Sequence, residues 1–258
     1  MGRSHHVRIL LINPNTSPEI TDLVAQYARA SAGGAEIFPV TGRFGARYIA
    51  SRAAAAIAAH AALDLLAEHV ARCDAVYLAC FGDPGLFALR EVSPVPVVGM
   101  AEASCRLAAV NGRTFSIVTG GVGWGPMLRE FVAMLDLSDK LASVRTIAPT
   151  GGTIVSDRNK HLEALAQACR ASADEDGADV VILGGAALAG LANVVAPGLP
   201  IPVICSVQAG MLGVLNAIDS PIRSSAGQVK NTAVESIGLS TNLTALLAGR
   251  GARSVVGP

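Results

Sequence analysis

Asp74-Ala-Val-Tyr-Leu-Ala-Cys80-Phe-Gly-Asp-Pro-Gly85 is the segment around which the predicted fold is built. A short apolar run bounded by turn residues is typical of a buried strand. Asp83 and Pro84 then predict a helix start, with Asp83 as the N-cap and Pro84 at the first helical position. Cys80 is therefore expected at the carboxyl end of a strand, beside the positive end of a helix, which favours a thiolate. A cysteine packed as a small hydrophobic residue is the alternative interpretation.

Composition restricts the class of protein. Of the 258 residues, 51% are hydrophobic and 4% aromatic, which suits an α/β fold with near-continuous apolar strands. Basic and acidic residues number 20 each, so charge gives no reason to expect binding to nucleic acid or to an anionic membrane. No apolar run reaches the length of a membrane span without interruption, and no signal peptide is recognised. The five cysteines lack CxxC spacing, so we predict neither a metal site nor disulfides, and we expect a reducing, cytoplasmic location.

The order of predicted elements repeats after Asn111-Gly112. The corresponding strands are 7–13 and 115–119, 75–80 and 180–185, and 95–99 and 201–205. This repeat predicts an α/β fold of two similar, doubly wound parallel-sheet domains related by a pseudo-twofold axis. Strand ends from both domains then face each other across a cleft, with Cys80 on one wall and Gly185 at the equivalent place on the other.

The end of the chain is predicted to be helical, with one helix at about residues 227–247, and to pack back onto the first half. We therefore predict a first domain of residues 1–99 plus 210–258 and a second of residues 100–209. The active-site cleft is expected between these two domains.

Five short motifs in this order resemble the Asp/Glu/hydantoin racemase superfamily, and most closely its hydantoin and allantoin racemase branch. They are Ile12-Asn-Pro-Asn-Thr-Ser17, Ala79-Cys-Phe-Gly-Asp-Pro-Gly85, Arg90-Glu91, Val97-Val-Gly-Met-Ala-Glu-Ala103 and Phe115-Ser-Ile-Val-Thr119. The resemblance covers nearly the whole chain. It implies a cofactor-independent racemase that acts on a small molecule, without a metal, and that forms a homo-oligomer.

The resemblance also implies a mechanism. In that family two cysteines face each other across the cleft, one removing the α-proton and the other returning a proton from the opposite face. Inversion needs an acid and a base on opposite faces of a planar carbanion, and the enolate oxygen needs hydrogen-bond donors. Cys80 takes the place of the first cysteine, as the thiol base acting on a hydantoin- or allantoin-like substrate.

Three positions depart from the family pattern, and all lie at predicted strand ends. Gly185 stands where the second cysteine is expected, Gly120 where a second threonine is usual, and Cys205 where an aspartate is usual. Cys205 is considered as a substitute for the missing thiol. A one-thiol lyase or decarboxylase of the arylmalonate decarboxylase type, and a non-catalytic binding homologue, are the alternative functions.

Polar and glycine-rich turns after the strands supply the expected substrate-binding residues. These are Asn13, Thr16, Ser17, Gly45, Phe81, Gly82, Thr119, Gly120 and Ala186. The alternative for the first turn is structural, with Asn13 ending a strand and Thr16 or Ser17 capping a helix. Arg47 flanks the cleft loop and is interpreted as a solvated side chain.

Overall fold

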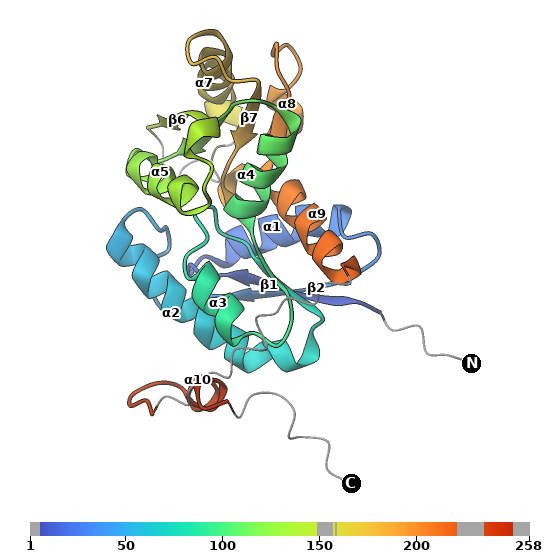
Figure 1. Ribbon diagram of the computed structural model, residues 1–258, viewed down its shortest axis with the longest axis vertical. Coiled ribbons are helices and arrows are strands. Elements are labelled where there is room, and N and C mark those ends of the chain that lie inside the picture. Colours follow the sequence, from blue (N-terminus) through green and yellow to red (C-terminus); the bar gives the residue numbers. More distant parts are fainter. Residues whose placement is uncertain (1–5, 149–156, 158, 221–234, 250–258) are drawn as a thin grey trace, which may run out of the picture.

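The computed structural model describes residues 6–148, 157, 159–220 and 235–249. These residues contain two four-stranded parallel sheets (Figure 1). The first has the order β2-β1-β3-β4, with β1 (Arg8–Asn13), β2 (Glu36–Thr41), β3 (Ala75–Leu78) and β4 (Val97–Gly99). The second has the order β6-β5-β7-β8, with β5 (Phe115–Gly120), β6 (Leu141–Ile147), β7 (Val180–Leu183) and β8 (Val203–Cys205). The matching orders confirm the predicted fold of two similar α/β units.

Helices connect the strands. In the first half these are α1 (Pro18–Ala30), α2 (Arg52–His69), α3 (Leu86–Val92) and α4 (Met100–Asn111). The second half contains α5 (Trp124–Met134), α7 (Leu162–Asp174), α8 (Ala192–Val195) and α9 (Ser206–Asp219), and α10 (Thr241–Leu247) follows. Residues 9–12 of β1 and 180–183 of β7 are buried along their whole length, as expected for strands of a parallel sheet covered on both faces.

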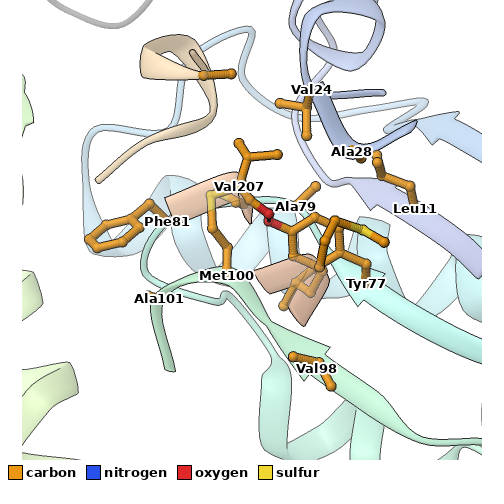
Figure 2. Close-up of a cluster of buried hydrophobic side chains, with 14 of the residues drawn as sticks. Leu11, Val24, Ala28, Tyr77, Ala79, Phe81, Val98, Met100, Ala101 and Val207 are labelled. Atoms are coloured by element: carbon orange, nitrogen blue, oxygen red, sulfur yellow. Dashed lines mark hydrogen bonds between the residues drawn. The ribbon is translucent and has the colours of Figure 1, made fainter. Parts of the chain in front are cut away.

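The last two helices return to the first half of the chain. Helix α9 packs against α4, α1, β3 and β4, and α10 packs against α2. Tyr77 of β3 links α9 to the first sheet, because its hydroxyl donates to the carbonyl oxygens of Ser206 and Val207 at 3.4 Å (Figure 2). Gly210 permits this contact, since a Cβ there would lie 2.4 Å from Tyr77. This packing agrees with a discontinuous first domain, whose exact boundaries stay a prediction.

Two sequence-based predictions need correction. The tail helix expected at 227–247 covers only Thr241–Leu247 among the described residues, because Ser240 caps it by accepting from the Leu243 N–H; residues 227–234 lie outside the described ranges.

The 21-residue segment Arg52–Arg72 is long and apolar enough to cross a membrane by length and composition. It packs against β1, α3 and α10, as a core helix does.

Candidate active site

A cavity of about 450 Å³ lies where the carboxyl ends of the inner strands of the two sheets meet. The residues that line it are Asn15, Ser17, Glu19, Ile20, Arg47, Tyr48, Ile49, Cys80, Phe81, Thr119, Gly120, Trp124, Gly185, Ala186, Ala187 and Leu188. Ligands of open parallel sheets bind at this edge of the strands. Both halves of the repeat therefore contribute to one concave site.

Cys80 and Gly185 occupy equivalent positions in the two halves. Cys80 stands two residues after β3 ends at Leu78, Gly185 stands two residues after β7 ends at Leu183, and both line the cavity. A Cβ on Gly185 would meet the Thr119 hydroxyl oxygen at 3.6 Å, which is ordinary contact. The backbone of Gly185, however, has φ +141°, which L side chains rarely adopt. The cavity has space for a side chain at this position, but the local backbone suits glycine.

The Cys80 thiol is neutral in this environment. Its side chain is buried, and burial, together with the nearby Asp83 carboxyl, raises the pKa of Cys80 far above its usual range. The expectation that a helix end beside Cys80 favours a thiolate is therefore wrong in this structure. Desolvation disfavours the charged form of a thiol more than the partial charge of a helix end stabilises it.

Asp83 caps a different helix from the one predicted. Helix α3 begins only at Leu86, after Gly85, and the Asp83 carboxylate instead accepts from the N–H groups of Ala101 at 2.9 Å and Glu102 at 2.7 Å. These N–H groups belong to the first turn of α4. The left-handed backbone of Asp83 (φ 46°) turns its side chain toward that helix. Burial raises the pKa of Asp83 to about 7, although both backbone hydrogen bonds lower it.

The turn after β1 is organised by Asn13. Its buried carboxamide donates to the Asn15 side-chain oxygen at 2.9 Å and to the Thr21 hydroxyl at 2.9 Å. The Asn15 oxygen in turn accepts from the Ser17 N–H at 2.9 Å, and the Ser17 hydroxyl donates to Glu19 at 2.7 Å. Asn13 thus acts behind the cavity wall and holds the turn that brings Asn15 and Ser17 to it.

The loop of residues 42–51, between β2 and α2, forms another wall and reaches the second half. The Tyr48 hydroxyl donates to the Gly120 carbonyl oxygen at 2.8 Å. Arg47 lies 3.4 Å from Glu19 through Nη2 and Oε1, and both side chains are exposed at the cavity. Gly45 is not a lining residue. The start of this loop approaches the turn after β1 so closely that a Cβ on Gly42 would lie 2.6 Å from the Pro14 carbonyl oxygen.

Two aromatic rings cross between the halves. A Cβ on Gly184 would lie 2.4 Å from the Phe81 ring, and a Cβ on Gly82 would lie 2.4 Å from the Trp124 ring. Phe81 of the first half thus packs on the glycine after β7, and Trp124 of the second half packs on the glycine after β3. These contacts join the strand ends that carry Cys80 and Gly185.

The family model described as "Asp/Glu/Hydantoin racemase" matches residues 9–212. The chain belongs to this racemase family. A hydantoin racemase of Paenarthrobacter aurescens is 36% identical over 208 residues, which cover 79% of this chain and 87% of that protein.

Solved structures show the same relationship. The allantoin racemase of Klebsiella pneumoniae has a TM-score of 0.78 and 33% identity, and the match covers 81% of this chain and 86% of that one. Unliganded arylmalonate decarboxylase has a TM-score of 0.58 and 18% identity, covering 82% and 92%, which is a likeness of fold alone. The predicted family and the prediction of an isomerase-type enzyme are confirmed.

The structure of this family member brings together some of the predicted site residues. Those that line the cavity are Ser17, Cys80, Phe81, Thr119, Gly120, Gly185 and Ala186. Those that do not are Asn13, Thr16, Gly45, Gly82 and Cys205. Cys205 ends β8 and is buried near Tyr77, so it is not positioned as a second thiol of the cavity. Within the described residues, no three His, Cys, Asp or Glu side chains gather as a metal site.

Several lining residues were missed from the sequence, notably Asn15, Glu19, Tyr48 and Trp124. Asn15 lies inside the family-like motif after the first strand, and Trp124 begins α5 directly after the glycine-rich turn that follows β5. Both turns had been recognised, so their polar and aromatic members were detectable. Tyr48 had no such signal, because it lies in a loop without periodicity.

Glu102 lies close to the Asp83 carboxylate and takes part in an ion-pair network. Its carboxylate pairs with Arg90 and, at 3.0 Å, with Arg106. Burial raises the pKa of Glu102, but the two arginines outweigh burial and keep it below its usual value. Glu102 does not line the cavity, and its two ion pairs indicate a structural role on α4.

Proposed function

We propose that this protein is a cofactor-independent isomerase that acts at the acidic α-carbon of a hydantoin- or allantoin-like substrate, with Cys80 as the thiol that exchanges the proton. The observation that carries the proposal is the position of Cys80, because among the described residues it alone brings a sulfur atom to the cavity wall. The hydantoin and allantoin racemases to which the chain is similar support the substrate class.

The proposed reaction begins when Cys80, as a thiolate, removes the proton from the α-carbon. The electron pair left on carbon is delocalised onto the ring carbonyl oxygen, which needs hydrogen-bond donors. The hydroxyls of Ser17 and Thr119 and the amide of Asn15 are among the polar groups of the wall. A proton returned by water in the space at Gly185, beside Thr119, would give the opposite enantiomer. The hydroxide that remains would take up the proton held by Cys80, which restores the thiolate and water.

The test starts from one enantiomer of a 5-substituted hydantoin, or of allantoin, and follows the loss of optical rotation. Cys80→Ser is expected to abolish inversion, because a serine hydroxyl is a far weaker acid than a thiol. Cys205→Ser is the matched control, since Cys80 and Cys205 are both 7% exposed at strand ends but only Cys80 lines the cavity. An absence of inversion across a broad panel of both substrate types would refute the proposal.

A one-thiol lyase is the second candidate, favoured by the glycine at position 185 and the neutral Cys80 thiol. Decarboxylation of a disubstituted malonate breaks the bond to one carboxylate and leaves an enediolate, which takes its proton from Cys80. A single donor delivers that proton to one face, so one enantiomer is expected. A racemic acid, or full activity in Cys80→Ala, would exclude this candidate. A cytoplasmic location and a homo-oligomer stay predictions.

A further inference from the structure

We propose that α10 positions the cavity-lining loop of residues 42–51 through Asp64 and thereby raises the affinity for substrate. The family model ends at residue 212, so α10 lies outside the part of the chain that it matches. The chain thus carries, beyond its matched core, a helix that acts on the site indirectly. The effect on substrate affinity rests on the proposed function, whereas the effect on the loop does not.

Helix α10 is docked on α2 by two kinds of contact. Leu243 and Leu246 of α10 are buried against the core. Ser240, the N-cap of α10, accepts from the Leu243 N–H at 3.2 Å and donates its hydroxyl hydrogen to Oδ1 of Asp64. Asp64 is buried in the middle of α2, so this hydrogen bond satisfies an atom that would otherwise be costly to bury.

The same carboxylate holds the start of the loop. Oδ2 of Asp64 accepts from Arg43, whose second terminal nitrogen pairs with Glu68. Burial raises the pKa of Asp64, but the hydrogen bonds from Ser240 and Arg43 outweigh burial, so its pKa is lowered and it is charged at neutral pH. One buried carboxylate therefore connects α10 to the loop.

The loop runs from Arg43 to the second half of the molecule. Arg47, Tyr48 and Ile49 line the cavity, and the Tyr48 hydroxyl reaches Gly120. At the far end, a Cβ on Gly123 would lie 2.6 Å from the Ala50 carbonyl oxygen, and Arg52 pairs with Glu130 at 3.2 Å through Nε and Oε2. The loop is thus held at both ends. At the Arg43 end, Asp64 adds a buried side-chain contact to the backbone hydrogen bonds that Gly42 and Ala46 make with the turn after β1.

Loss of the Ser240 hydroxyl leaves one oxygen of a buried carboxylate without its donor. Asp64 is then expected to turn toward water, which weakens its hold on Arg43 and frees the loop. Substrate binding must re-order the loop, so affinity falls, while Cys80 and its surroundings stay unchanged. A charge-assisted hydrogen bond that is partly replaced by water implies that KM rises roughly fivefold with kcat nearly constant.

The chain carries its own reporter, because Trp124 is its only tryptophan and is 7% exposed. A Cβ on Gly121 would lie 2.6 Å from the Tyr48 hydroxyl and 3.6 Å from Cδ1 of Trp124, so both side chains flank Gly121. Quenching of Trp124 fluorescence by acrylamide therefore measures how well the loop covers this wall, with no substrate present.

The experiment compares four variants of the full-length protein with the wild type. Ser240→Ala is expected to increase acrylamide quenching and KM, and Ser240→Thr, which keeps the hydroxyl, to restore both. Arg43→Gln breaks the link from the loop side without touching α10 and should reproduce Ser240→Ala. Asn242→Ala is the matched control, an exposed residue of the same helix, and should behave as wild type.

The outcomes separate this inference from the proposed function. Increased quenching in Ser240→Ala and Arg43→Gln, but not in Asn242→Ala, supports loop positioning even if no hydantoin or allantoin is converted, and then only the proposed function fails. A lower melting temperature in Ser240→Ala with unchanged quenching and KM would overturn the inference, because Ser240 would then be only a helix cap. Increased quenching with unchanged KM, or equal quenching in Asn242→Ala, would also overturn it.

Discussion

Replacement of Gly185 by cysteine is expected to restore a second thiol to the cavity at a measurable cost in stability. The new Cβ would meet the Thr119 hydroxyl oxygen and Cγ of Leu188 at 3.6 Å and Cδ1 of Leu188 at 3.8 Å, so no clash is expected. The backbone is the obstacle, since φ +141° is sparsely populated by L residues. Holding a side chain there costs about 1–3 kcal/mol of unfolding free energy.

Gly185→Ala is the matched control, because it carries the same backbone strain and Cβ but no thiol. Both variants are expected to lose a similar amount of unfolding free energy in urea. A positioned acid or base contributes about 10²–10⁴-fold to proton transfer, so even an imperfectly placed thiol should raise inversion about tenfold or more over Gly185→Ala. The assay uses one hydantoin enantiomer in deuterated water, with polarimetry for inversion and NMR for α-deuterium exchange.

The ratio of inversion to exchange is the decisive quantity. In the wild type, Cys80 alone should exchange the α-proton on one face faster than it inverts the centre. If Gly185→Cys and Gly185→Ala give the same ratio while Cys80→Ser abolishes exchange, position 185 does not face the substrate carbon and the equivalence of the two halves fails at the site. If neither variant is destabilised, the backbone at Gly185 is not held as described.

Three further changes test the contacts that hold the segments around the cavity. Tyr48→Phe removes the hydrogen bond to Gly120, and we expect a loss of about 1 kcal/mol in urea unfolding together with a higher KM; unchanged values of both would contradict the role of the loop. Gly82→Ala places a Cβ 2.4 Å from the Trp124 ring at φ +110°, so we expect a loss of more than about 2 kcal/mol and red-shifted tryptophan emission, and an unshifted spectrum would count against it. Asp83→Asn removes a carboxyl whose pKa is raised from 3.8 to about 7 by burial. The folded wild type binds the extra proton between those values, so its stability falls as pH rises through that window. As pH rises through this window, the wild type should lose up to about 4 kcal/mol of unfolding free energy relative to Asp83→Asn. A difference between the two proteins that is independent of pH would refute this.

The strands and their duplication were predictable because they follow from periodicity. Continuous apolar runs bounded by turns identified the inner strands of both sheets. The two positions that follow the third strand of each half, Cys80 and Gly185, were then placed by counting along equivalent elements. Because the two halves repeat, these two positions are expected at one cavity, and this can be predicted without knowing any side-chain conformation.

The partner of Asp83 was not predictable from local rules. Capping preferences state that an aspartate near a helix start bonds to free N–H groups, but they do not identify the helix. Here the left-handed residues Asp83 and Gly85 turn the chain, and the free N–H groups come from α4, 18 and 19 residues further along. The tertiary arrangement decides between the two helices.

The cavity loop was unpredictable for a related reason. Residues 42–51 have no hydrophobic period, and Arg47 was interpreted as a solvated side chain. The role of its neighbour Tyr48 depends on the tertiary structure, which places the Gly120 carbonyl oxygen of the other half 2.8 Å from the Tyr48 hydroxyl. Asp64 was hidden in the same way, since its two partners come from positions 43 and 240.

The glycine at position 185 leaves Cys80 to act alone, and the two candidate reactions need different protonation states of its thiol. The dependence of the rate on pH therefore distinguishes them. Inversion starts with a thiolate, so its rate is expected to rise with pH as long as pH stays below the raised pKa of Cys80. Decarboxylation creates the carbanion by losing carbon dioxide and then needs the neutral thiol, which is the form that burial already favours. Its rate should be independent of pH across the neutral range. The buried, uncharged cysteine thus supplies a proton donor without further change, whereas a racemase built on the same residue must first ionise it, through substrate binding or higher pH.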